Sequence, residues 1–305
     1  MKIRIVGMGA LGLLFGSLLS EHYGSASVRF LMNHDRYLTH SKDVYRINGK
    51  EVHFALEDAD SLTEEECPAD FILVSVKYSG LEGALREMKN LVGPGTVIVS
   101  LMNGISSEQI IGERFGREKV VDSVAIGMDA VRTGTDLIYS HMGVIRIGIS
   151  QGETKESLDR AVSILSGAGI PVEVQDDVLH TMWSKFQLNV GINQTCMVYD
   201  CGYGKAVEEG SEQYEKLVGA MREVIKIAEA EQISLTEADT QSNLKVIRSL
   251  NPALYPSMEQ DRKAHRPSEV ELFAGTVIRI AEKHGIDVPV NREYYTRVKE
   301  IERNY

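Results

Sequence analysis

The strongest constraint on the fold is a run of three glycines that directly follows an apolar segment at the start of the chain. Lys2–Val6 is rich in β-branched residues and predicts a strand, while Leu11–Ser20 is apolar at helical spacing. The segment that joins them fits the pattern G-x-G-x-x-G and reads Gly7-Met8-Gly9-Ala10-Leu11-Gly12. A strand, this loop and a helix in that order predict a Rossmann-type turn that binds a dinucleotide.

Each glycine of this loop has a physical role. The first permits a tight turn, the second lets a pyrophosphate approach the backbone, and the third lets helix and strand pack closely. The helix N-terminus then offers free N–H groups and a partial positive charge to the phosphates. We therefore expect all six residues to line a cofactor site. A glycine-rich turn without a ligand is the alternative.

The end of the second predicted strand, Ser27–Met32, bears on which dinucleotide binds. NAD enzymes usually place an acid there, where it binds the adenosine ribose. This chain has Asn33 instead, with Arg36 close behind, and this pair suits the 2′-phosphate of NADP. We therefore predict NADP(H) as the cofactor. Two alternatives stay open: Asp35 binds the ribose, or Arg36 is a solvated surface residue.

Strand and helix patterns alternate up to about residue 175 and then become almost purely helical. Apolar runs at Phe71–Val76 and Thr96–Leu101, with a helical segment Gly80–Leu91 between them, predict strands buried on both faces. Further strands are expected at 120–128, 137–141 and 144–149, as an antiparallel extension around a turn at Met142-Gly143. Helices are predicted at 180–193, 214–231, 236–250, 257–265, 269–284 and 291–303. The predicted fold is α/β, with a Rossmann-type doubly wound sheet in residues 1–175 and an all-helical domain in residues 176–305.

A polar stripe runs along the first helix of the second domain. Lys185, Asn189 and Asn193 are four residues apart and share one face within about 80° of arc, while apolar side chains cover the rest. The stripe is either solvated or catalytic. In the catalytic interpretation the lysine donates a proton to a carbonyl oxygen as hydride arrives, and the asparagines orient lysine and substrate.

Two acid or amide positions outside this helix have both a structural and a functional interpretation. Asn103-Gly104 follows a predicted parallel strand at the edge where such sheets bind ligands, but it is also a common turn sequence. Glu269 follows Ser268, which together with Glu271 resembles a capping box, so Glu269 could simply be an acid in a first helical turn.

Taken together, these motifs resemble the 2-dehydropantoate 2-reductase (ketopantoate reductase) family over the whole chain. The landmarks occur in order: the glycine loop, Val76-Lys77, Asn103-Gly104, Trp183-Ser184-Lys185 with Asn189 and Asn193, Ser257-Met258-Glu259-Gln260-Asp261, Glu269, and His284-Gly285-Ile286 with Pro289. The resemblance implies an active site in a cleft between a Rossmann domain and a helical domain. It also implies reduction of 2-dehydropantoate to pantoate, a step of pantothenate and coenzyme A biosynthesis.

By this resemblance, Lys185 is the general acid, and Glu269 holds the substrate hydroxyl and positions the lysine. Ser257 binds the substrate carboxylate, and Lys77 lies near the adenosine part of the cofactor. The remaining amides orient substrate, lysine and nicotinamide ribose: Asn103, Asn189 and Asn193.

Several residues depart from the family pattern, chiefly where substrate is expected. Asn33 stands where the family often has an arginine, Gln194 replaces a proline, and Leu254 and Ala274 replace asparagines. Tyr203 stands where a polar loop residue is expected. These departures affect the identity of the keto acid more than the reaction type.

Other functions compete with this one. A related Rossmann-plus-helical dehydrogenase acting on another 2-keto acid is one alternative, since opine and glycerol-3-phosphate dehydrogenases resemble this layout. A non-catalytic NADP-binding sensor is another, although the presence of both Lys185 and Glu269 argues against it.

Composition limits the partners. The formal net charge of −11 disfavours nucleic-acid binding, and no apolar run approaches the ~20 residues of a membrane span. Three cysteines, Cys67, Cys196 and Cys201, are too few and too irregularly spaced for a disulfide or zinc framework, so we expect a cytoplasmic protein. A small-molecule 2-keto acid is the expected partner, and the sequence is compatible with a homodimer.

Overall fold

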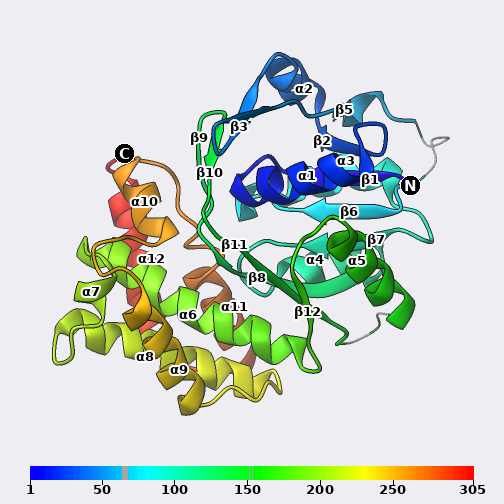
Figure 1. Ribbon diagram of the computed structural model, residues 1–305. Coiled ribbons are helices and arrows are strands. Elements are labelled where there is room, and N and C mark those ends of the chain that lie inside the picture. The colour runs from blue at the N-terminus through cyan, green and yellow to red at the C-terminus, as the bar shows by residue number, and fades with distance from the viewer. Residues whose placement is uncertain (64–67, 151, 153) are drawn as a thin grey trace. The chain divides into compact units, whose positions relative to one another are not determined.

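The computed structural model describes residues 1–63, 68–150, 152 and 154–305, so Cys67 lies outside the described residues. The chain divides into two compact units (Figure 1). One comprises Met1–Met102 and Ser107–Val178, and the other comprises Asn103–Ser106 and Leu179–Tyr305. The short segment around Asn103 thus groups with the helical unit.

The first unit is built on an eight-stranded sheet, whose strands are labelled in Figure 1. In spatial order its strands are β12 (Val172–Val174), β11 (Met142–Gly148), β8 (Val120–Met128), β7 (Val97–Ser100), β6 (Phe71–Val74), β1 (Ile3–Val6), β2 (Val28–Met32) and β5 (Leu56–Asp58). The six strands from β8 to β5 run parallel to one another, and β11 pairs antiparallel with β8. This order confirms the predicted doubly wound sheet, with its direction of winding reversed between β1 and β6.

Helices cover both faces of this sheet. The core on one face includes side chains of α1 (Ala10–Tyr23) and α5 (Lys155–Gly167), and the core on the other includes α3 (Leu81–Met88) and α4 (Ser107–Phe115). The central strands β1, β6 and β7 are buried along their whole length. Burial on both faces explains their continuous apolar sequences.

A second sheet of four short strands was not predicted. Its order is β4 (Lys50–Val52), β3 (Tyr45–Ile47), β10 (Asp136–Ile138) and β9 (Val131–Thr133). The expected strand at 137–141 belongs to this sheet, and the expected turn at Met142-Gly143 is wrong, because β11 begins at Met142 and the β9–β10 hairpin joins it to β8.

The second unit is helical, as predicted. Its helices are α6 (Val178–Tyr199, which begins at the boundary), α7 (Tyr203–Ala206), α8 (Glu212–Ala230), α9 (Glu237–Ser249), α10 (Ser257–Lys263), α11 (Ala274–His284) and α12 (Pro289–Glu302). The first unit also contains α2 (His34–His40). Within the described part of the chain, no helix is both long enough and apolar enough to span a bilayer.

One boundary differs in a way that matters for the site. The helix expected from Glu269 begins only at Ala274, with a bend at Glu269 and a turn over residues 270–273. The predicted capping box is wrong, because Ser268 donates to Glu302 at 2.7 Å and Glu271 accepts from Tyr295. Glu269 is therefore not an acid in the first turn of α11.

A buried hydrogen-bond chain closes the base of the loop that follows β7. Ser100 Oγ donates to Ser107 Oγ at 2.9 Å, and Ser107 Oγ lies 2.9 Å from Glu108 Oε2. Burial, together with the neighbouring Asp122 carboxylate, raises the pKa of Glu108 to about 8, although Ser107 and Arg117 oppose this shift. These hydrogen bonds thus connect β7 to the first turn of α4, and the acid that takes part in them is neutral near pH 7.

We predict that Glu108→Gln flattens the pH dependence of stability. The pKa of Glu108 is about 8 in the folded protein against an ordinary value of 4.5 for a glutamate, so between these values the folded state holds the extra proton. The contribution of Glu108 to the free energy of unfolding is therefore greatest below pH 4.5 and falls as pH rises towards 8. The slope is at most about 1.4 kcal/mol per pH unit.

Urea unfolding of both proteins from pH 5 to pH 8 measures this difference. Glu113→Gln, on the exposed side of the same helix, is the matched control and should keep the wild-type slope. Parallel slopes in wild type and Glu108→Gln would show that Glu108 is ionised in the folded protein.

Candidate functional site

Two of the three glycines after β1 are required by the fold. Gly7 has φ +109°, and a Cβ there would lie 2.7 Å from the carbonyl oxygen of Ser75. A Cβ at Gly12 would lie 2.1 Å from the carbonyl oxygen of Gly7. These contacts pack the start of α1 against the loops that follow β1 and β6.

The middle glycine is different. Gly9 has φ −70° and ψ −175°, which any residue can adopt, and a Cβ there would meet only Ser75 O at 3.6 Å, an ordinary contact. Gly9 is also the N-cap of α1 and has no side chain to bond the first N–H groups. The space that a side chain at Gly9 would fill therefore fits an anionic group approaching the helix N-terminus.

The other residues of the loop turn into the protein. Met8 is buried in the core, and Ala10 and Leu11 pack partly buried against it. Only their backbone groups are therefore suited to contact a ligand.

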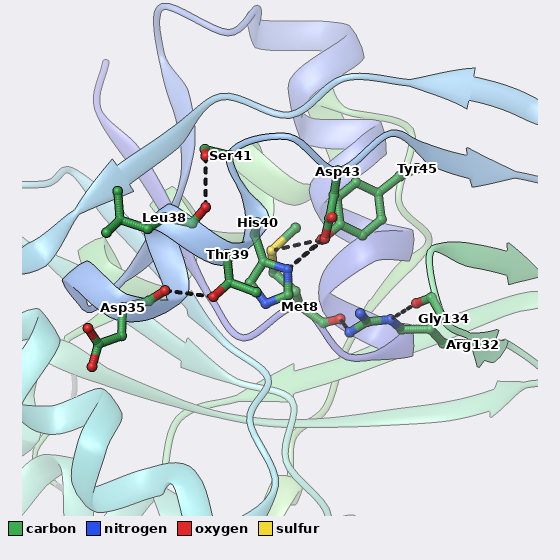
Figure 2. A network of polar contacts seen from close by, with 10 residues as sticks. All are labelled: Met8, Asp35, Leu38, Thr39, His40, Ser41, Asp43, Tyr45, Arg132 and Gly134. Atoms are coloured by element: carbon green, nitrogen blue, oxygen red, sulfur yellow. Dashed lines mark hydrogen bonds and ion pairs between the residues drawn. The ribbon is translucent and has the colours of Figure 1, made fainter.

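A side chain from the small sheet also reaches this loop. Figure 2 shows Arg132 of β9 donating to the carbonyl oxygen of Met8, with its Nε donating to Gly134 O at 2.7 Å. Tyr45 Oη lies 3.7 Å from Met8 Sδ, and burial raises the pKa of Tyr45 to about 12. Arg132 is a cation at the glycine loop that the sequence analysis missed, because it is 124 residues from Met8.

Asn33 and Arg36 lie at the end of β2, and each has a partner within the protein. Asn33 follows β2 and caps α2, its Oδ1 accepting from the backbone N–H of Arg36 at 3.0 Å. The Arg36 side chain is 38% exposed, and its Nη1 lies 3.7 Å from Oε1 of Glu87 on α3. Asn33 therefore has a structural role, and Arg36 has an acidic partner that the sequence did not indicate.

Two acids near the end of β2 form hydrogen bonds with His34. His34 Nδ1 lies 2.7 Å from Asp58 Oδ2, and the backbone N–H of His34 donates to Asp60 at 2.8 Å. The hydrogen bond to Asp58 raises the pKa of His34. Asp35 lies in the first turn of α2, and its carbonyl oxygen accepts from Thr39 (Figure 2).

Lys77 lies at the same edge of the sheet. It is exposed, follows β6, and precedes the 3₁₀ turn Tyr78–Gly80. Since β1, β2 and β6 are parallel, the segments that follow them leave one edge. The first unit thus gathers the glycine loop, Asn33, Arg36 and Lys77 at this edge.

In the second unit, one amide bridges a cation and an acid. Lys185 Nζ donates to Asn103 Oδ1 at 3.2 Å, and Asn103 Nδ2 donates to Glu269 Oε2 at 3.2 Å. An amide between an ammonium and a carboxylate has one favourable orientation, because only its oxygen accepts and only its nitrogen donates. Three residues separated by up to 166 positions are therefore brought together.

The glycine after Asn103 permits this arrangement. Gly104 has φ +90°, and a Cβ there would lie 2.6 Å from Leu272 Cδ1. Leu272 belongs to the turn that begins at Glu269, and its N–H donates to Glu269 O. Asn103-Gly104 is thus more than a surface turn, because its backbone packs closely against the segment that carries the acid.

The rest of the polar stripe bonds to the start of α10. Asn193 Nδ2 donates to Asn189 Oδ1 at 3.3 Å, and Asn193 Oδ1 accepts from Ser257 Oγ at 3.0 Å and from the Met258 N–H at 3.3 Å. Asn189 and Asn193 are 9% and 4% exposed. The second unit therefore holds two groups: Lys185–Asn103–Glu269, and Asn189–Asn193–Ser257.

Known proteins resemble this chain over its whole length. A 2-dehydropantoate 2-reductase of Streptococcus pyogenes serotype M3 is 25% identical over 300 residues, covering 96% of this chain and 95% of the relative. One from Halobacterium salinarum is 26% identical and covers both chains completely.

Solved structures share the fold. A 2-dehydropantoate 2-reductase from Geobacter metallireducens has a TM-score of 0.83 at 24% identity and covers 98% of this chain and 99% of its own. A D-mandelate dehydrogenase solved with NADH and anilino(oxo)acetate has a TM-score of 0.86 at 23% identity, covering 100% and 99%.

The family models agree with both units. The model described as ketopantoate reductase PanE/ApbA matches residues 3–152, and the model of its C-terminal part matches residues 177–302. Residues 3–152 include the glycine loop and Asn103, and residues 177–302 include Lys185 and Glu269. The chain therefore belongs to the ketopantoate reductase PanE/ApbA family.

Proposed function

We propose that this chain is an NADPH-dependent reductase of a 2-keto acid, with 2-dehydropantoate as substrate and pantoate as product. The observation that carries the proposal is the bonded chain Lys185–Asn103–Glu269. The relatives named 2-dehydropantoate 2-reductase support the choice of substrate at about a quarter identity. In this proposal residues 1–175 bind the dinucleotide and residues 176–305 the substrate, except that Asn103 acts together with Lys185.

The nicotinamide ring supplies the hydride when the cofactor is bound. Reduction places negative charge on the carbonyl oxygen of the keto acid, and this oxygen must then be protonated. The ammonium group of Lys185 stabilises that charge and donates the proton. Its bond to Asn103 Oδ1 restricts the position of Nζ, so that the proton is presented from one direction.

The other polar residues act on the rest of the substrate. Glu269 accepts from Asn103 through Oε2 and is proposed to accept from the substrate hydroxyl as well, thereby positioning Lys185 through the amide. Ser257 is proposed to bind the substrate carboxylate, and Asn193 holds its Oγ in place. Asn189, bonded to Asn193, completes the polar face beside the lysine.

The adenosine end of the site supports NADPH. The strand end carries the neutral Asn33, and the nearby acids Asp58 and Asp60 bond to His34. Arg36, in the first turn of α2, offers a guanidinium to the 2′-phosphate. Lys77 adds a second cation at the same edge.

The assembly and the location are also proposals. We propose a homodimer, because a ketopantoate reductase from Staphylococcus aureus with the same fold is described as dimeric, at a TM-score of 0.81 and 17% identity. The cytoplasmic location stays a prediction.

We predict that wild type binds NADPH more tightly than NADH. Two variants separate the contribution of the pyrophosphate site from that of the 2′-phosphate site. Gly9→Val should abolish binding of both dinucleotides while the fold survives, because its side chain would occupy the space of the pyrophosphate. Arg36→Ala should weaken NADPH by about tenfold or more and leave NADH nearly unchanged. Fluorescence titration gives both dissociation constants, and thermal melting checks the fold. Normal NADPH binding by Gly9→Val would remove the glycine loop from the site.

We predict that Lys185→Ala loses about 10²- to 10⁴-fold in kcat while its NADPH dissociation constant stays near that of wild type. The reason is that this change removes the proposed proton donor to the carbonyl oxygen. NADPH oxidation with 2-dehydropantoate measures the loss, and Lys226→Ala, an exposed lysine on α8, is the matched control. A near-normal kcat in Lys185→Ala would remove this lysine from the mechanism.

We predict a different pattern for Glu269→Ala. It should raise KM as well as lower kcat with 2-dehydropantoate, and it should lose less on a 2-keto acid without the hydroxyl group. Glu271→Ala, two residues away and bonded to Tyr295, is the control for the integrity of the turn. Equal losses on both substrates would limit Glu269 to positioning Lys185.

Mandelate, tested in the oxidative direction, extends the panel because a D-mandelate dehydrogenase shares the fold.

A further inference from the structure

A buried acid stands beside the proposed 2′-phosphate site. Glu87 lies on α3, which packs against β2, and its side chain is only 8% exposed. Its Oε1 is 3.7 Å from Arg36 Nη1, while its Oε2 is buried and has no hydrogen-bond partner among the described residues. A half-satisfied buried carboxylate is costly, so its presence calls for a reason.

The surroundings of Glu87 point to the adenosine end of the site. Burial raises the pKa of Glu87, whereas Arg36 and the backbone N–H of Asn33 lower it and Asp60 raises it. Asn33 directly follows β2, where dinucleotide-binding sheets place the acid that bonds the ribose hydroxyls. Here that position is neutral, and the acid beside it, Glu87, belongs to the neighbouring helix α3.

Glu87 and Arg36 have opposite effects on a 2′-phosphate. The guanidinium attracts the phosphate, whereas the carboxylate repels it and competes with it for the guanidinium. Because the two side chains pair, a 2′-phosphate must compete with Glu87 for Arg36, whereas a bare ribose loses nothing. Two other acids close to the strand end, Asp58 and Asp60, bond to His34.

We propose that Glu87 is a specificity-determining residue that holds Arg36 and thereby limits the preference for NADPH over NADH. This inference rests on the proposed binding of a nicotinamide dinucleotide at the glycine loop. It adds that the preference is set by the Arg36–Glu87 pair and not by the strand-end residue alone.

The test is a set of dissociation constants for NADPH and NADH. Glu87→Gln should tighten NADPH by about tenfold and change NADH by less than about twofold, because the guanidinium is released. Glu82→Gln removes the same charge from the exposed side of α3, where Glu82 pairs with Arg86, and should change neither constant. In Arg36→Ala the further change Glu87→Gln should give a much smaller gain, since Glu87 then has no guanidinium to hold.

The outcomes separate the two proposals. If Arg36→Ala weakens NADPH but Glu87→Gln shifts both cofactors by the same factor, the role of Glu87 is refuted and the cofactor site stands. A gain from Glu87→Gln that persists in full without Arg36 also refutes it. If the wild type binds neither dinucleotide, the proposed function itself fails. Should Glu87→Gln lower the melting temperature strongly, Glu87→Asp, which keeps the charge but withdraws it from Arg36, should give a smaller shift in the same direction.

Discussion

The site in the first unit depends on a contact that no side chain at position 12 would permit. A Cβ there would lie 2.1 Å from the Gly7 carbonyl oxygen, so α1 approaches β1 more closely than any other residue allows. This packing fixes the helix N-terminus at the edge where β1 and β6 end. The attraction for an anion then comes from oriented N–H groups. A chain with a net charge of −11 can therefore hold an anionic ligand there.

The second unit depends on the single orientation of an amide. Asn103 accepts from Lys185 and donates to Glu269, and exchanging its oxygen and nitrogen would place like partners together at both ends. Its backbone is fixed by Gly104 against Leu272. The contact between Ser100 and Ser107 closes the base of the same loop. A neutral amide thus contributes to the position of the lysine ammonium.

Features that depend on neighbouring residues could be predicted from the sequence, and features that depend on distant ones could not. The glycine loop and the stripe Lys185–Asn189–Asn193 follow from strand and helix periods within one short segment. The small sheet pairs residues 46–47 with residues 136–137, and only the Asn48-Gly49 turn, with φ +48° and +81°, offered a local signal. The capping box at Ser268 failed because its partner, Glu302, is 34 residues away. Arg132 and Glu87 were missed for the same reason.

The partner of a buried carboxylate shows what the acid can do, and the sequence does not reveal that partner. Glu87 and Glu108 both look like ordinary helical acids, yet one meets a guanidinium and the other a serine hydroxyl. Beside Asp122 and a neutral donor, Glu108 is favoured in its protonated form and serves as a structural hydrogen-bonding group. Burial raises the pKa of Glu87 as well, but Arg36 opposes this shift, and a carboxylate paired with a cation at a ligand site acts on every charged ligand that enters. Burial raises the pKa of both acids and therefore does not distinguish their roles; their partners, a guanidinium for Glu87 and a hydroxyl for Glu108, do.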